Sequence, residues 1–215
     1  MAEQGVRLFL IDDHRMFREG IASLVATDPS ITVVGQSAGG AGAVEETLTA
    51  SPDVVLLDIA MPGFNGLDLC RELKRRCPNV GVLIMTMLSD EDMVARALEY
   101  GASGYITKDA APEQFLDGVR AAARQELYLG PGIPQSVIGR IGRRGDDPYE
   151  RLSMRERQVL QLIAESKTNR EIAEELGVAL KTVNNHRVNL MRKLKIHDQT
   201  ALVKYAIRKG VVQLG

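Results

Sequence analysis

The stretch from Val54 to Asp58, with the sequence VVLLD, constrains the fold of this chain more than any other part of it. Four apolar residues end abruptly in a carboxylate, and the turn residues Pro62 and Gly63 follow closely. An apolar run without alternation predicts a strand buried on both faces, as in parallel sheets. In open α/β sheets, ligands bind outside the carboxyl ends of the strands, so we expect Asp58 at such an edge.

The first 125 or so residues alternate between strand and helix patterns. Short apolar runs predict five strands, over residues 6–11, 31–34, 54–58, 80–86 and 104–107. Helical periodicity and helix start and stop signals predict helices over 14–26, 41–50, from 67 to before Pro78, 91–100 and 112–124. Five β-α units require right-handed crossovers, and hence a parallel sheet with helices on both faces.

Polar residues stand at four of the predicted strand ends. Asp12 and Asp13 follow the first strand, Asp58 ends the third, Thr86 ends the fourth and Lys108 follows the fifth. Three carboxylates at one sheet edge repel one another unless a cation joins them, and Mg²⁺ suits an open carboxylate cluster. A metal, a lysine and a hydroxyl around Asp58 suit phosphoryl transfer, with Asp58 as the attacking group. Taken singly, Asp12 or Asp13 is better explained as a turn residue or helix N-cap, but the set is not.

Length and composition bound the class of protein. A chain of 215 residues suits two domains with separate cores. No apolar run approaches membrane-spanning length, and the first five residues lack a basic region followed by an apolar one, so we expect a cytoplasmic protein. Cys70 and Cys77 lie two turns apart on one predicted helix, beyond disulfide reach, and are interpreted as reduced packing residues.

Charge is distributed unevenly along the chain. Residues 151–215 hold 13 Lys and Arg against 6 Asp and Glu, whereas residues 1–150 hold 14 against 22. The imbalance indicates that the C-terminal part meets a polyanion. A stretch rich in Gly, Pro and charged residues separates the two parts and predicts a linker over 128–148, with a short helix within 133–141.

The basic C-terminal part carries a helix-turn-helix pattern. Ser153 with Glu156, and Thr168 with Glu171, form two capping boxes that open helices over about 154–165 and 169–176. Gly177 stands where the turn needs a positive φ. A helix over 180–194 and a fourth over about 202–207 follow.

The predicted helix over 180–194 is two-faced. Its phase places Arg187 on the inner side, which predicts a structural ion pair with Glu171 or Glu175. The outer face suits the major groove because Asn pairs with adenine, valine contacts the thymine methyl and basic residues anchor phosphates. The candidate DNA-contacting residues are Lys181, Thr182, Asn184, Asn185, Val188, Asn189 and Arg192.

These motifs resemble two known domain families. The acidic pair, Asp58 with the Met-Pro-Gly turn, Thr86 and the Tyr-Ile-Thr-Lys segment ending at Lys108 resemble the receiver domain of bacterial two-component response regulators, with Thr86 and Lys108 lying 28 and 50 residues after Asp58. The segments LSMRER and KTVNNHR resemble the four-helix LuxR-type DNA-binding domain. Together they make the chain similar to NarL/FixJ-class response regulators. Ala179 departs from the pattern, since the family commonly has a capping Ser there.

The resemblance implies specific roles. Asp58 is the phosphoacceptor; Asp13, Asp58 and the backbone carbonyl of Ala60 bind Mg²⁺, with Asp12 acting largely through water. Thr86 moves toward the phosphate and Tyr105 turns inward as a switch, although Tyr105 is equally well explained as an ordinary edge-strand aromatic. Ala60 and Leu88 lack groups that orient water, which predicts slow self-hydrolysis of the phosphoaspartate.

We therefore expect a flavodoxin-like, five-stranded receiver domain over 1–127, a linker over 128–148 and an all-α helix-turn-helix domain over 149–215. The predicted function is transcriptional control in which a sensor histidine kinase phosphorylates Asp58 and a homodimer binds double-stranded DNA. The only expected catalysis is self-phosphorylation and self-dephosphorylation. The alternatives are a Mg²⁺-dependent phosphohydrolase, which would need a second carboxylate just beyond Asp58, and a DNA-binding regulator with a vestigial receiver.

Overall fold

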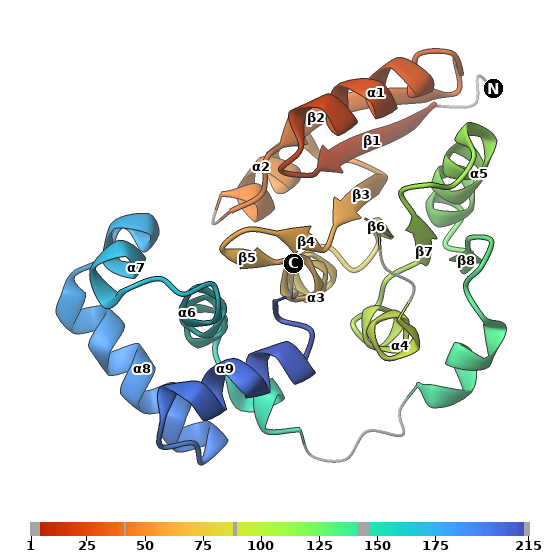
Figure 1. Ribbon diagram of the computed structural model, residues 1–215. Coiled ribbons are helices and arrows are strands. Elements are labelled where there is room, and N and C mark those ends of the chain that lie inside the picture. The colour runs from red at the N-terminus through yellow and green to blue at the C-terminus, as the bar shows by residue number, and fades with distance from the viewer. Residues whose placement is uncertain (1–4, 41, 88–89, 142–146, 213–215) are drawn as a thin grey trace. The chain divides into compact units, whose positions relative to one another are not determined.

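The computed structural model describes residues 5–40, 42–87, 90–141 and 147–212 (Figure 1). The chain divides into two compact units, residues 1–62 with 66–143 and residues 63–65 with 144–215. The first unit is α/β and the second is helical. In the described ranges, no helix is long and apolar enough to cross a membrane.

The α/β unit is built on one parallel sheet. Its strand order is β2-β1-β3-β6-β7-β8, and every neighbouring pair is parallel. The strands are β1 (Val6–Ile11), β2 (Ile31–Ser37), β3 (Val54–Asp58), β6 (Gly81–Thr86), β7 (Gly104–Thr107) and β8 (Tyr128–Leu129). The five predicted strands and the doubly wound fold are confirmed. The two-residue strand β8 is a sixth, which the sequence did not predict because it is too short to show a pattern.

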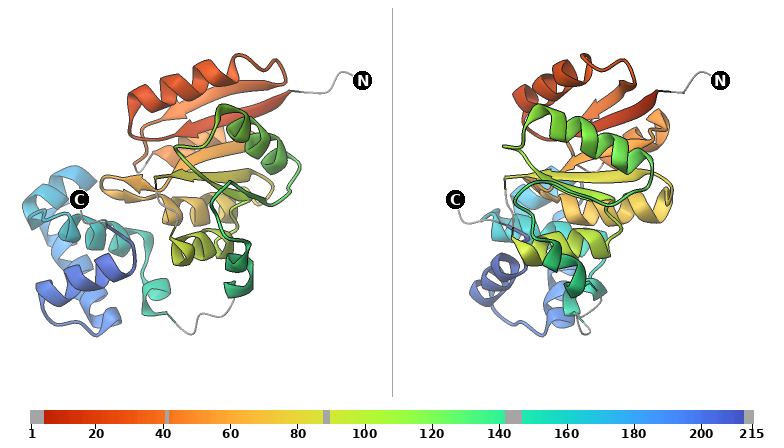
Figure 2. Two further views of the ribbon diagram at one scale, coloured as in Figure 1. Left: turned by 45° about the vertical axis from the view of Figure 1, so that its right-hand side comes forward. Right: turned by 90° about the vertical axis from the view of Figure 1, so that its right-hand side faces the viewer.

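Helices cover both faces of the sheet (Figure 2). They are α1 (Arg15–Val25), α2 (Ala43–Ala50), α3 (Gly66–Arg76), α4 (Glu91–Glu99) and α5 (Pro112–Ala123). Alternate strand residues such as Val54 and Leu56 form one core with Ile21 of α1 and Val119 of α5. The intervening residues Val55 and Leu57 point to the opposite face and are equally buried, which is why the β3 run does not alternate in polarity.

The segment after α5 adds structure to the first unit. β8 pairs with β7, so β7 is an inner strand. A 3-10 helix, Gln135–Arg140, lies where the sequence predicts a short helix and packs against α4. Val137 is fully buried there. Between Asp58 and α3, the chain also forms a small sheet of β4 (Ala60–Met61) and β5 (Phe64–Asn65).

The helical unit contains four α-helices after a short 3-10 helix, Pro148–Arg151. They are α6 (Met154–Ala164), α7 (Asn169–Leu176), α8 (Leu180–Leu194) and α9 (Gln199–Arg208). Both predicted capping boxes form, at Ser153 and at Thr168. Gly177 ends α7 in the left-handed region with φ of 62°, which glycine adopts without strain.

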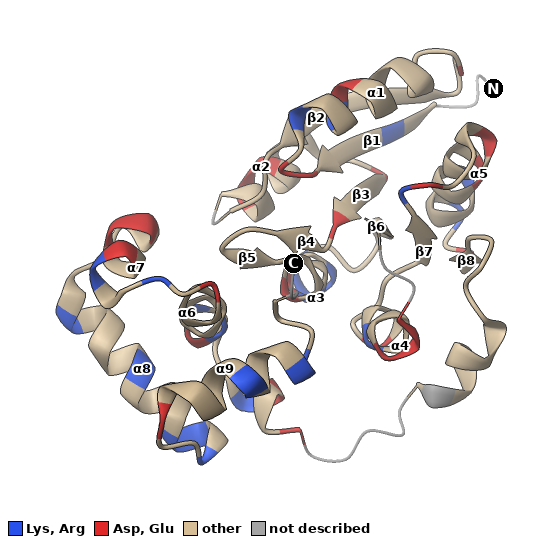
Figure 3. Ribbon diagram, in the orientation of Figure 1, with Lys and Arg blue, Asp and Glu red and all other residues tan. Residues whose placement is uncertain are grey.

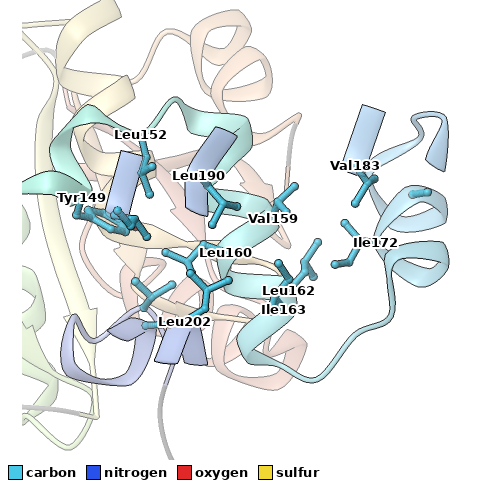
Figure 4. Packing of buried hydrophobic residues seen from close by; sticks show 14 residues of the cluster. Tyr149, Leu152, Val159, Leu160, Leu162, Ile163, Ile172, Val183, Leu190 and Leu202 are labelled. Carbon is cyan, nitrogen blue, oxygen red and sulfur yellow. The ribbon is translucent and has the colours of Figure 1, made fainter. Parts of the chain in front are cut away.

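One apolar cluster holds the four helices together (Figure 4). Val159 and Leu160 of α6, Val183 and Leu190 of α8 and Leu202 of α9 are all fully buried. Val183 and Leu190 are seven residues apart and therefore lie on the same side of α8. This fixes the opposite side of α8 as the outward one.

Candidate functional sites

Three carboxylates gather at the carboxyl edge of the sheet. Asp12 and Asp13 follow β1, and Asp58 ends β3. These two strands are adjacent and parallel, so their carboxyl ends lie side by side. Together with His14, the three carboxylates offer ligand atoms that all lie within 4.8 Å of one another. Asp12 and Asp58 are each only 1% exposed. The strand-end argument therefore predicted this juxtaposition correctly.

Lys108 supplies positive charge within this cluster. Its Nζ lies 2.7 Å from Asp12 Oδ2 and 2.7 Å from Asp58 Oδ2. The Phe17 ring also contacts the ammonium, with its centroid 4.8 Å from the same Nζ. The Lys108 backbone N–H donates to the Thr86 carbonyl at 2.7 Å, which ties the ends of β6 and β7 together.

Local backbone geometry holds Asp58 in place. The Ala60 N–H donates to Asp58 Oδ1 at 3.0 Å. Gly66, at the start of α3, comes so close that a Cβ there would lie 2.3 Å from the Asp58 carbonyl oxygen. A side chain at position 66 would therefore displace the end of β3.

Burial sets the protonation chemistry of the pair. Desolvation raises the pKa of Asp58, and the hydrogen bonds from Ala60 and Lys108 offset it only in part. Burial alone would lower the pKa of Lys108, but its hydrogen bonds to Asp12 and Asp58 raise it overall. Lys108 therefore stays an ammonium at neutral pH. For Asp58, burial disfavours the charged carboxylate more than its hydrogen bonds favour it.

Thr86 and Tyr105 are both fully buried beside this edge. Thr86 is the last residue of β6 and follows Met85, which pairs with Asp58. Tyr105 lies in β7, and burial raises the pKa of its hydroxyl. The interpretation of Tyr105 as an edge-strand aromatic is wrong, because β8 covers the outer side of β7. Leu88 lies outside the described residues.

His14 and Phe17 belong to the cluster although sequence reasoning missed their contacts. His14 is the N-cap residue of α1, and its Nδ1 lies 3.3 Å from Asp12 Oδ1 and 3.1 Å from Asp13 Oδ1. The sequence could have indicated the His14 contacts, because His14 directly follows the acidic pair. It carried no signal for the Phe17 contact, because only the fold brings α1 over Lys108.

The acidic cluster fits a divalent cation. Asp13 Oδ1 is buried yet accepts no hydrogen bond within the described residues, although His14 Nδ1 is nearby. A buried carboxylate oxygen without a donor is costly unless a cation binds it. Hard carboxylate oxygens that converge within 4.8 Å are the ligands that Mg²⁺ prefers.

The outward face of α8 carries most of the predicted DNA-contacting residues in exposed positions. Within the helix the charged residues are basic: Lys181, Arg187, Arg192 and Lys193 (Figure 3). Val188 is 66% exposed, an unusual position for an apolar side chain on a helix with a polar face. The exposed candidates are Lys181, Asn184, Asn185, Val188 and Arg192, and the half-buried ones are Thr182 and Asn189. Ala179 is the N-cap residue and offers no side-chain cap, as predicted.

Arg187 is turned inward as predicted, but its partners are different. The expected ion pair with Glu171 or Glu175 is wrong. Glu171 is held by its own capping box, and Glu175 pairs with Lys167 at 3.5 Å. Arg187 instead donates to the amide oxygens of Asn169 and Gln199, at 3.1 and 2.8 Å.

The first unit is a parallel sheet with three carboxylates and a lysine at its carboxyl edge, and a basic helix-turn-helix follows it. This combination defines a two-domain regulator with a receiver and a DNA-binding domain. Comparison with known proteins agrees. Residues 8–120 match the response regulator receiver domain, and residues 150–206 match the bacterial regulatory proteins of the luxR family. The chain therefore belongs to the two-component response regulators with a LuxR-type DNA-binding domain.

Full-length relatives share both domains. The chain is 36% identical over 209 residues to the transcriptional regulatory protein LiaR of Bacillus subtilis (strain 168), covering 96% of this chain and 99% of LiaR. The crystal structure of the response regulator ChrA of a heme-sensing two-component system is 31% identical, with a TM-score of 0.52 and coverage of 97% and 100%. RcsB from Salmonella enterica serovar Typhimurium, bound to promoter P1flhDC in the presence of the phosphomimetic BeF3−, is 25% identical, with a TM-score of 0.54 and coverage of 94% and 98%.

Proposed function

We propose that Asp58 accepts a phosphoryl group from a sensor histidine kinase and that this controls DNA binding by α8. The observation that carries the proposal is the Lys108 ammonium held 2.7 Å from a buried Asp58 carboxylate. That arrangement places a cation where the phosphoryl oxygens would arrive.

Each residue of the cluster has a task in the transfer. An Asp58 oxygen forms the new bond to phosphorus, and the bond from phosphorus to the donor nitrogen breaks. Lys108 stabilises the charge on the transferred oxygens, and Thr86 donates its hydroxyl to one of them. The Ala60 N–H, 3.0 Å from Asp58 Oδ1, keeps the carboxylate oriented for in-line attack. Self-phosphorylation from small phosphodonors and self-dephosphorylation use the same groups.

Asp12, Asp13 and Asp58, with the Ala60 carbonyl, would hold Mg²⁺. The ion supplies further charge neutralisation at the phosphoryl oxygens. The orphaned Asp13 Oδ1 supports this assignment, since a bound cation would satisfy it.

The output of the switch is the helical unit. Its outward α8 residues are proposed to enter the major groove, with the candidate residues named above contacting bases and phosphates. RcsB, a structural relative, is bound to a promoter in the presence of a phosphomimetic. We propose that this chain likewise binds DNA as a two-fold homodimer on paired half-sites, with Thr86 and Tyr105 changing position when Asp58 is phosphorylated.

The test compares wild type and Asp58→Asn, each with and without beryllofluoride, on duplexes selected from a random pool by treated wild type. Tighter binding only by treated wild type supports phospho-control. Equal binding in all four conditions refutes it and favours a vestigial receiver.

A further inference from the structure

A directed chain of hydrogen bonds links three helices of the DNA-binding unit. Arg187 of α8 donates from Nη1 to Asn169 Oδ1 at 3.1 Å and from Nη2 to Gln199 Oε1 at 2.8 Å. Asn169, the first residue of α7, donates from Nδ2 to Asn184 Oδ1 at 2.8 Å. Asn184 is exposed on the α8 face proposed to meet DNA.

The chemistry of Arg187 fixes the direction of this chain. An asparagine side chain can usually be turned over without changing its shape, so the positions of its oxygen and nitrogen are ambiguous. A guanidinium has donors and no acceptor, so Asn169 must offer Arg187 its oxygen. The Asn169 nitrogen then faces Asn184, which must accept with its own oxygen. The remaining group of Asn184, the Nδ2 amino group, is left for a partner outside the protein.

We propose that Asn184 presents its amino group to the major groove in a fixed orientation, with Asn169 and Arg187 as the positioning residues that impose it. The inference rests on the proposed entry of α8 into the major groove. An outward amino group selects bases that present acceptors, namely guanine with O6 and N7, thymine with O4 and adenine with N7. It disfavours cytosine, which presents only the N4 amino donor in the major groove.

Asn185 provides the matched control. It is the next residue on the same face and is also exposed, and within the described residues its side chain makes no hydrogen bond. Its amide is therefore free to turn over and can pair with adenine in the two-bonded manner. Of these two chemically identical neighbours, only Asn184 is thus predicted to disfavour cytosine.

The decisive variant is Asn169→Asp. Its carboxylate still accepts from Arg187, but it has no amino group for Asn184. The carboxylate instead accepts from Asn184 Nδ2, which turns Asn184 Oδ1 outward. The base preference at one position should then move from guanine or thymine, which present only acceptors, to cytosine, which presents only a donor. Asn185→Asp makes the same atomic change outside this chain of hydrogen bonds and should alter the base preference at a different position.

The experiment selects duplexes from a random pool with the full chain and beryllofluoride, for wild type, Asn184→Ala, Asn185→Ala and the two Asp variants. Asn184→Ala identifies the base pair that Asn184 reads. There, wild type should favour guanine or thymine over cytosine by about 5- to 150-fold, the range for one good base contact. Thermal unfolding checks that each variant folds.

The outcomes separate this inference from the proposed function. A wild-type preference for cytosine, or an unchanged preference in Asn169→Asp, overturns the inference. So does a result in which Asn185→Ala changes the selected base but Asn184→Ala does not, although α8 would then still read DNA. If neither alanine variant changes base preference or affinity, the proposed role of α8 itself fails.

A second measurement needs no DNA. Side-chain amide signals of Asn169 and Asn184 are assigned by their loss in the Asn169→Asp and Asn184→Asp variants. The Asn169 NH2 protons should exchange slowly with water because one of them is bonded to Asn184. The Asn184 NH2 protons should exchange rapidly, and protected Asn184 protons would contradict the proposed polarity.

Discussion

Replacing Lys108 with methionine tests the electrostatic balance of the phosphoryl site. The substitution keeps the length and apolar stem of the side chain but removes the ammonium that lies 2.7 Å from both Asp12 and Asp58. Both carboxylates are 1% exposed, so water cannot replace the lost cation. The receiver should therefore lose stability at neutral pH in the absence of divalent ions.

The size of the loss follows from two opposing effects. At an effective dielectric constant of 20, a charge pair 2.7 Å apart is worth about 6 kcal/mol before desolvation. The Lys108 side chain is only 8% exposed, so the cost of burying its ammonium offsets most of the gain. Removing one partner of a buried pair leaves an uncompensated charge, which costs about 3 to 5 kcal/mol. We expect a loss of that order in Lys108→Met.

The assay is native-state hydrogen exchange of β3 amides in the full chain, which reports receiver stability separately from the helical unit. Millimolar Mg²⁺ should stabilise Lys108→Met more than wild type, since it restores a cation between the carboxylates. Adding Asp58→Asn should also recover part of the loss. Lys204→Met, on the exposed side of α9, is the control and should leave β3 unchanged. Wild-type protection of β3 in Lys108→Met without Mg²⁺ would refute the reasoning.

Four further changes test other parts of the structure. Because burial raises the pKa of Asp58, the folded state holds that proton more tightly than the unfolded state, and stability falls as pH rises between the ordinary carboxyl pKa of about 3.9 and the raised one. Asp58→Asn should therefore unfold at a higher temperature than wild type at pH 7, with the difference disappearing below that interval. Ala179→Ser should stabilise the helical unit by about 1 kcal/mol in urea unfolding, because the N-cap of α8 lacks a side-chain acceptor. Phe17→Leu should slow phosphorylation by acetyl phosphate about 2- to 5-fold through loss of the contact with Lys108 Nζ, and Phe17→Tyr should restore the rate. Ala60→Asn should shorten the lifetime of the phosphoaspartate, measured by phosphate release, because it adds a group that can orient water; an unchanged lifetime would contradict that prediction.

The acidic edge could be predicted from sequence because parallel sheets have a simple rule. Each strand ends where its apolar run ends, and all carboxyl ends meet at one edge, so Asp12, Asp58 and Lys108 needed no further information to be brought together. The strand β8 and the Phe17 contact were out of reach. A two-residue strand has no period, and the ring over Lys108 depends on how α1 packs across the sheet.

The helical unit shows a different limit. Helical periodicity correctly predicted that Arg187 lies on the inner side of α8, because the side on which a residue lies depends only on its position within that helix. It could not name the partners, because Glu171 and Glu175 were already engaged with neighbours close in sequence. Local capping and pairing between residues close in sequence carry a small loop-closure cost, so they compete well against contacts between helices.

This competition also explains why the Arg187 partners are amides. A guanidinium that points inward needs hydrogen-bond acceptors. A carboxylate would accept from it but has no donor to pass on to a further residue. An amide accepts with one atom and donates with the other, so it passes the direction of the hydrogen bond onward. Asn169 does this between Arg187 and Asn184. Because Arg187 bonds to an amide and not to a carboxylate, the exposed Asn184 side chain has a fixed orientation. A helical projection of α8 alone could not reveal it.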